Sequence, residues 1–239
     1  MKKIKFYPYS EETVALDINP EASSKFLPEW YKKAPAVINN GGISFGMIGT
    51  TIKKCMPIFD LITAGYIIPA PCDIYVDATN PEKLEWSIPA GILKLQADMF
   101  AVHAREQYEH LPINKDMYHK DLFRIFPFWS VGTPKGYSSI FLQPAYSDSS
   151  PLTALQAIVD TDSFVSNGHL SFLVEKDFKG IIKKGTPLIQ VIPFKRESWG
   201  KTLESVKKSE NIFSTQGLKL RSVFSNGYKN FFRSKKEYR

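Results

Sequence analysis

The sequence predicts a mainly β protein with an irregular N-terminal arm and helices at its C-terminal end. From Tyr66 to about Phe194, short runs rich in Ile, Val, Phe and Tyr are separated by Pro, Gly, Asn, Asp and Ser. This rhythm is typical of an all-β sandwich or barrel. No such run alternates with a long helical pattern, which argues against a parallel doubly wound sheet. The 239 residues, 43% of them hydrophobic, suffice for a sizeable core, so we expect one domain over residues 1–239.

The N-terminal third divides into two parts. Residues 1–50 form a proline-rich arm with one short helix expected around residues 24–33, because prolines end helices and cannot donate to a sheet. Residues 51–65 predict a buried helix, since apolar side chains recur at helical spacing and Pro57 suits the first turn.

The rest of the chain is a predicted β core over residues 66–195 and a basic helical C-terminus over residues 199–239. A short helix is expected from Trp199 to Ser209. Aromatic and aliphatic residues then recur every three or four positions from Gly217 to Lys236, which predicts an amphipathic helix.

The net charge of +7 comes mostly from the end of the chain, where seven basic side chains face one acid, Glu237. Three interpretations stay open: phosphates of a nucleic acid, an anionic membrane surface, or an aromatic face packed on the body with the lysines in water. The last is the commonest fate of such a stripe and is favoured. The nucleic-acid interpretation would use Lys219, Arg221, Lys229, Arg233, Lys235, Lys236 and Arg239.

Several classes of protein are not indicated. No apolar run approaches the roughly 18 residues of a membrane span, and the first residues turn polar too early for a signal peptide, so a cytoplasmic location is expected. Cys55 and Cys72 are too few for a disulfide framework. The chain lacks a Gly-X-Ser-X-Gly elbow and a Walker loop. The four histidines do not form a recognisable ligand set, so we predict no metal site and no particular cofactor: His103, His110, His119 and His169.

Asp160 and Asp162 follow an apolar run and have two interpretations. In the first, they end a strand and their carboxylates accept backbone N–H bonds in the following turn. In the second, they face a pocket beside Lys135, Tyr137 and Gln190 that binds a nucleoside or another small polar ligand. The turn is favoured, because aspartates at strand ends are common turn residues.

Four short segments resemble the dUTPase and dCTP deaminase superfamily, in the order that this superfamily has them over residues 63–192. Ala157-Ile-Val-Asp-Thr-Asp162 resembles its Gly-Val-Ile-Asp-X-Asp-Tyr strand, and Gly185-Thr-Pro-Leu-Ile-Gln190-Val-Ile192 resembles its Gly-Asp-Arg-Ile-Ala-Gln-Leu-Ile strand. Thr133-Pro-Lys-Gly-Tyr-Ser138 stands where its Arg-Ser-Gly motif would, and Thr63-Ala-Gly-Tyr66 is similar to its Ala-Gly-Tyr-Asp motif. The resemblance implies a β-clip fold; a jelly-roll sandwich is the alternative.

The resemblance also implies a homo-oligomer and a set of site residues. Asp160 would be a general base that polarises a water molecule. Tyr137 or Phe164 would stack on a base, and Lys135 or Arg196 would lie near phosphate. The complete set of implied ligand-binding residues is Lys135, Tyr137, Ser138, Asp162, Phe164, Gln190 and Arg196.

The chain departs from that superfamily where phosphate and magnesium would bind. Ile67 stands in place of the aspartate that helps hold magnesium, and Pro187 in place of the arginine. Without these groups a triphosphate would meet uncompensated negative charge, so we expect no dUTPase activity. Whether the protein is an enzyme of another kind stays open.

A second resemblance covers most of the chain, from about Trp30 to Trp199. The segments KKCMPIFDLITAGYIIPAP, TPKGYS and IQVIPFKRESW are similar to an uncharacterised family found in tailed phages of marine bacteria and in some bacteria. It implies a phage source, with the protein in the host cytoplasm or in the virion. Two functions remain: a dUTPase-like β domain that binds a nucleotide or another small polar ligand, or a virion or assembly protein with the β core as a packing module.

Overall fold

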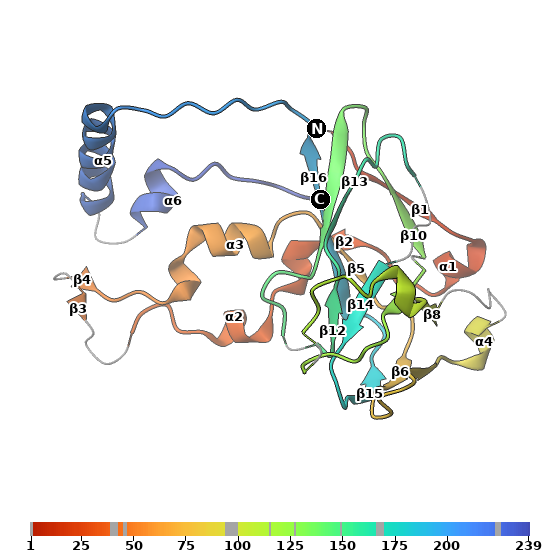
Figure 1. Ribbon diagram of the computed structural model, residues 1–239. Helices are drawn as coiled ribbons and strands as arrows, with labels where there is room; N and C mark the ends of the chain where they lie inside the picture. The colour runs from red at the N-terminus through yellow and green to blue at the C-terminus, as the bar shows by residue number, and fades with distance from the viewer. Residues whose placement is uncertain are drawn as a thin grey trace.

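The computed structural model of the chain is mainly β, as predicted (Figure 1). It describes residues 2–38, 43–44, 47–93, 100–114, 116–126, 128–148, 150–165, 170–222 and 226–239. Every strand pair in it is antiparallel. The antiparallel sheets and the C-terminal helices confirm the predicted fold class.

Two larger sheets form the centre of the molecule. The first has the strand order β13 (Ala157–Val159), β11 (Tyr137–Leu142), β16 (Pro187–Lys195), β5 (Tyr66–Pro69), β2 (Glu21–Ala22). The second has the order β12 (Leu152–Ala154), β14 (Leu170–Val174), β9 (Phe123–Ile125), β8 (Phe100–Val102).

Three smaller sheets and several short helices complete the described structure. The sheets are β15 (Lys179–Ile182), β6 (Ile74–Asp77), β7 (Glu85–Ser87); β1 (Lys5–Pro8), β10 (Trp129–Gly132); and β3 (Ile43–Ser44), β4 (Met47–Ile48). The α-helices are α1 (Glu11–Ala15), α2 (Glu29–Lys33), α3 (Met56–Ile62), α4 (Ala90–Leu93), α5 (Val206–Arg221) and α6 (Gly227–Phe231). Single 3-10 turns are η1 (Ser23–Phe26), η2 (Ile52–Lys54) and η3 (Arg105–Gln107).

One hydrophobic core joins the sheets. Its largest fully buried apolar side chains come from strands of the five-, four- and three-stranded sheets: Phe100, Phe123, Phe172, Ile74, Ile125, Leu152 and Ile189. The stacked Phe100 and Phe123 rings have centroids 6.2 Å apart. The alternation of buried and exposed positions along β6, for example, is what a strand with one core face requires.

The N-terminal arm is more ordered than its prolines suggest. β1 pairs with β10, and β2 extends the five-stranded sheet beside β5. The helix expected around residues 24–33 is two elements, η1 and α2, which are separated at Leu27 and Pro28 because proline cannot continue the preceding turn. The helix predicted over residues 51–65 is also shorter than expected: η2 covers Ile52–Lys54, and α3, with Pro57 in its first turn, covers only Met56–Ile62.

The prediction of a helix from Trp199 to Ser209 is wrong. α5 begins only at Val206, where the Ser205 Oγ accepts a hydrogen bond from the Lys208 N–H at 3.4 Å. A serine at this position stabilises a helix start, whereas Gly200 and Thr202 upstream are weak helix formers. The amphipathic stretch from Gly217 to Lys236 is likewise divided between the end of α5 and the short α6.

The basic tail returns to the body and docks on Asp60 of α3. Arg233 Nη2 lies 2.7 Å and Lys236 Nζ 2.9 Å from the Asp60 carboxylate, and the Tyr238 ring meets Tyr66 edge to face. Lys235 and Arg239 pair with Glu237. Four of the seven basic residues proposed for nucleic acid are therefore engaged within the chain, and the Arg221 side chain lies outside the described residues. Nucleic-acid binding stays a prediction.

We expect Asp60→Asn to release this tail. Burial raises the pKa of the Asp60 carboxyl, but the hydrogen bonds from Arg233 and Lys236 outweigh burial and hold it below the usual value. Losing these charge-assisted bonds costs about 2 kcal/mol, which is roughly a 30-fold rise in the undocked fraction. Trypsin cleavage after Arg233 at neutral pH reports this fraction. The exposed pair of Lys83 and Glu85 supplies the control, since Glu85→Gln should leave the cleavage rate unchanged.

The same contact predicts a pH dependence. Because the folded-state pKa of Asp60 is depressed, docking is complete above the unfolded pKa, near 4, and is lost as the pH falls through the lower folded value. Near-ultraviolet circular dichroism should report the loss of Tyr238 packing below pH 4. A signal that stays constant down to pH 2 would contradict the assignment of docking to this ion pair.

Candidate functional site

The predicted aspartates lie at one end of the five-stranded sheet, where β13 ends beside β11. Asp162 accepts two hydrogen bonds from Arg196, at 2.8 Å and 2.5 Å, and a third from the Gly136 N–H at 2.8 Å. Its side chain is 5% exposed. These partners, Arg196 first, hold the pKa of Asp162 well below its usual range, so it stays ionised. Asp162 thus fastens the residue 133–136 loop to the start of the chain that follows β16.

Asp160 is more open than Asp162. Its Oδ1 accepts a hydrogen bond from the Ser138 Oγ at 2.6 Å, and Arg196 Nη1 lies 3.3 Å from the same atom. The side chain is nevertheless 62% exposed. Its main-chain carbonyl closes the turn by accepting from the N–H groups of Ser163 and Phe164. The carboxylates therefore reach across to the neighbouring loop, and the main chain makes the turn.

The other predicted residues divide into two groups. Lys135 and Phe164 are exposed on the two loops that Asp160 and Asp162 join. The Tyr137 OH accepts a hydrogen bond from Lys2 Nζ at 2.6 Å, and the same amine lies 4.3 Å from the centre of its ring. The structure thus places Tyr137 beside Ser138 and Arg196, whose Nη1 donates to the Tyr137 carbonyl at 3.2 Å. For the Lys135 and Phe164 side chains, no hydrogen bond, ion pair or ring contact with this cluster is found among the described residues.

Gln190 does not join this cluster. It pairs with Leu142, five positions along β11 from Tyr137, and is fully buried. Its amide donates to the carbonyls of Leu61 and Ala64, and its carbonyl accepts from the Ala145 N–H. All three hydrogen bonds connect Gln190 to the main chain of the fold. The prediction that Gln190 lies beside the aspartates is therefore wrong.

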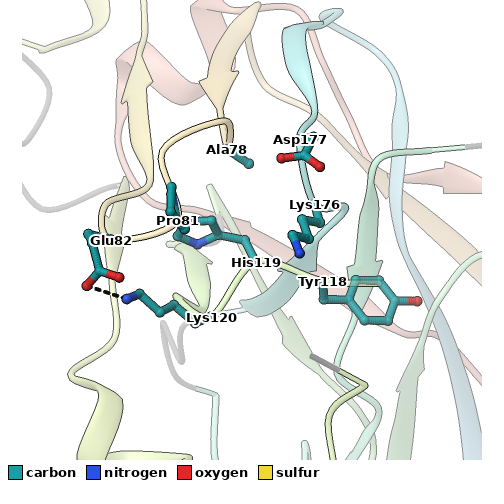
Figure 2. Close-up of a pocket in the computed structure, with 8 residues that line it drawn as sticks. All are labelled: Ala78, Pro81, Glu82, Tyr118, His119, Lys120, Lys176 and Asp177. Carbon is teal, nitrogen blue, oxygen red and sulfur yellow. Dashed lines mark ion pairs between the residues drawn. The ribbon is translucent and has the colours of Figure 1, made fainter. Parts of the chain in front are cut away.

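A separate hollow, which the sequence did not indicate, lies where three loops meet (Figure 2). It measures about 280 Å³ and is lined by Ala78, Pro81, Glu82, Tyr118, His119, Lys120, Lys176 and Asp177. Tyr118 also lines two adjoining hollows of about 260 and 360 Å³. Together they form a trough around one tyrosine, which we call the Tyr118 trough.

The hollow of Figure 2 takes its apolar surface from Ala78, Pro81 and the Tyr118 ring. Its other lining side chains are polar or charged: Glu82, His119, Lys120, Lys176 and Asp177. Figure 2 shows Lys120 paired with Glu82, at 2.5 Å, while the Lys176 amine points toward His119 and Tyr118. Lys120 holds the pKa of Glu82 below its usual value. Among the residues that the structure describes, no ion pair is found for Lys176 or for Asp177. The hollow of Figure 2 therefore presents one amine and one carboxylate, both exposed, that have no charged partner within the described ranges.

The floor of the trough is fixed by hydrogen bonds. His119 is buried; its Nδ1 accepts from the Asp121 N–H at 3.0 Å, so its Nε2 donates to the Asn80 carbonyl at 2.8 Å. Asp121 in turn accepts from Arg105 Nε at 2.7 Å and from the Leu84 N–H. Both ring nitrogens are used, so His119 contributes a shaped surface and not a metal ligand. In the described parts of the chain no cluster of His, Cys, Asp or Glu fits a metal ion.

No signal in the sequence could have found the trough, because its residues come from loops that are far apart in the chain. Tyr118 and Glu175 meet in an isolated β-bridge, and the Lys176 N–H donates to the Met117 carbonyl. Asp177 has the left-handed backbone conformation, with φ of 63°, that the tight turn before β15 requires. None of these residues forms a spaced motif.

Comparison with known proteins gives one structural similarity. No family model matches the chain, and no curated protein matches it. A solved structure that it resembles is a single-residue mutant of the dUTPase from phage phi11 of S. aureus, determined to describe the coordination of a structural Mg(II) ion. The similarity covers 86% of this chain and 97% of that one, with 11% identity and a TM-score of 0.33. A similarity this low carries no argument about fold or function.

In the described residues, no helix is both long enough and apolar enough to cross a bilayer.

Proposed function

We propose that the β domain binds a small polar ligand, with nucleotides as the first class to test, in the Tyr118 trough. One observation carries this proposal: a partly apolar hollow holds an amine and a carboxylate that pair with no charged group in the described part of the chain. A pocket of this kind, with a few polar groups on a fixed frame, is where small molecules usually bind. The Asp160 cluster is a weaker candidate because Arg196 and Asp162 already neutralise each other.

The ligand is expected to place an acceptor group at Lys176 and a planar or apolar part between Pro81 and Tyr118. A charge-assisted hydrogen bond contributes about 1.5–3 kcal/mol. Lys176→Ala should therefore weaken binding by roughly 10-fold to 100-fold.

The resemblance of TPKGYS and related segments to tailed-phage proteins supports a phage source, with a location in the host cytoplasm or the virion.

A thermal-shift screen against deoxynucleotides and nucleosides tests the proposal, since a ligand that binds only the folded state raises its apparent stability. A compound that stabilises the wild type should stabilise Lys176→Ala much less and Asp160→Ala equally well. The reverse pattern would move the site to the turn after β13. If none of these compounds shifts the wild type, the nucleotide assignment is wrong.

A second candidate function is that of a subunit in a homo-oligomeric assembly, and one observation favours it. The favoured interpretation of the basic C-terminus expects its apolar face to pack on the body of the protein. In the structure, α5 packs against α6 instead. Figure 1 shows α5 apart from the sheets. This candidate does not depend on ligand binding.

A further inference from the structure

The chain leaves the β body after β16 and exposes large apolar side chains before it returns. We call residues 196–222 the C-terminal excursion: residues 196–205 have neither helix nor strand, and α5 follows. Trp199 is 87% exposed, Leu203 92% and Phe213 71%. Several large apolar side chains this exposed within one segment favour an interaction surface.

The excursion is anchored to its own body at both ends. At its start, the Arg196 N–H donates to the Gly136 carbonyl and its guanidinium holds Asp162. Beyond its end, the tail docks on Asp60 through Arg233. The side-chain hydrogen bonds and the ion pair described for α5 and its cap stay within residues 204–222. The excursion therefore projects as a tethered loop.

The exposed surface has the size of a stable interface. Val206, Phe213 and Leu220 follow one another at seven-residue intervals and so share one face of α5. With Trp199 and Leu203 they offer on the order of 700 Å², if each aromatic side chain counts for roughly 200 Å² and each aliphatic one for somewhat less. A standard interface buries about 800 Å² of each partner.

A matching apolar surface lies on the same chain, on one face of the five-stranded sheet. Ile158 of the edge strand β13 stands opposite Ile140 of β11, which stands opposite Ile192 of β16. Residues directly opposite each other share a face, so they form a row, here the isoleucine row. Ile158 is 66% exposed, and Asp160 continues the same face two residues further on.

The charges of the two surfaces also fit. Lys201 lies between Trp199 and Leu203 in the excursion and is exposed. Asp160 lies beside Ile158 in the isoleucine row. A lysine flanked by apolar side chains would thus meet a carboxylate at the end of an apolar row.

We propose that the C-terminal excursion of one copy docks on the isoleucine row of a second copy, with Trp199 and Leu203 over Ile158 and Lys201 at Asp160. This inference deepens the second candidate function and rests on it. Each copy carries both surfaces, and we take the exchange to be reciprocal, so that two copies close into a dimer. It is the excursion that crosses to the neighbour, because the tail that follows is held on its own body.

The experiment is a complementation between two variants of the full chain, followed by light scattering after size exclusion. Leu203→Glu disables the excursion and Ile158→Glu disables the row. Losing one hot-spot side chain weakens a contact about 30-fold, and a reciprocal dimer has two such contacts, so each variant should self-associate about 1,000-fold more weakly. Mixing the two should restore a heterodimer, because the intact excursion of one variant fits the intact row of the other. Both side chains are exposed, so thermal unfolding should be unchanged.

Ile181→Glu is the matched control, an isoleucine of β15 that is 52% exposed and lies outside both surfaces; it should associate like the wild type. If the wild type associates but mixing restores nothing, or if Ile181→Glu acts like Ile158→Glu, the docking surface is wrong while the assembly function stands. A wild type that stays monomeric at high concentration overturns both.

Discussion

Gly65→Ala is expected to destabilise the protein by about 3 kcal/mol or more, enough to unfold a marginal domain. Gly65 has a φ of 69°, in the left-handed region, and a Cβ there would lie 2.0 Å from the Val191 carbonyl oxygen. This neighbour is backbone of the central strand β16, so it cannot move aside like a side chain. Urea unfolding followed by circular dichroism measures the change.

Gly136→Ala separates the clash from the backbone strain. Gly136 has a φ of 84°, yet a Cβ there would meet nothing within 4 Å. Only the cost of a left-handed alanine remains, about 1 kcal/mol. Equal losses for the two variants would show that the close approach to Val191 contributes nothing.

The position of Gly65 shows what the sequence could predict. Thr63-Ala-Gly-Tyr66 was noticed as a motif, and the structure gives it a physical role as the turn that passes from α3 into β5 against the β16 backbone. The β core was predictable because alternating apolar runs and turn residues encode strands locally. The position of α3 inside residues 51–65 was predictable because apolar spacing and Pro57 agreed, but its bounds, Met56–Ile62, were not.

The failures concern contacts between distant segments. Trp199 to Ser209 has helical spacing, but the Ser205 cap and Gly200 decide where α5 starts. The Tyr118 trough was invisible because Pro81, Tyr118 and Lys176 meet only through strand pairing. A strand pattern shows which residues alternate, and it does not show which loops converge.

The aspartates illustrate a partial success. They were predicted either to form a turn or to face a ligand, and Asp162 instead binds Arg196 and the Gly136 N–H. The sequence separates these partners by more than 25 residues, so the pairing depended on the register of β11 with β13 and β16. The Asp160 carboxylate stays exposed, and in the proposed assembly it pairs with Lys201 of the second copy.

Gln190→Met is expected to cost about 4 kcal/mol of folding free energy, although the side-chain volume hardly changes. The glutamine bridges three backbone groups: it donates to Leu61 O at 2.8 Å and Ala64 O at 2.7 Å, and accepts from Ala145 N at 2.9 Å. Methionine leaves all three in a buried place without a partner, and each such group costs about 1–3 kcal/mol. The contacts also join α3 and the loop after β11 to the central strand.

Gln143→Met is the control. The same residue type there is only half-buried and, within the described residues, makes one hydrogen bond, from the Ala154 N–H at 2.7 Å. Its expected cost is about 1 kcal/mol. Denaturant unfolding of both variants measures the difference, and ligand binding by the folded fraction of Gln190→Met should equal that of the wild type. If instead Gln190→Met keeps its stability and loses ligand binding, Gln190 belongs to a site after all, and the structural role that its three hydrogen bonds assign to it is wrong.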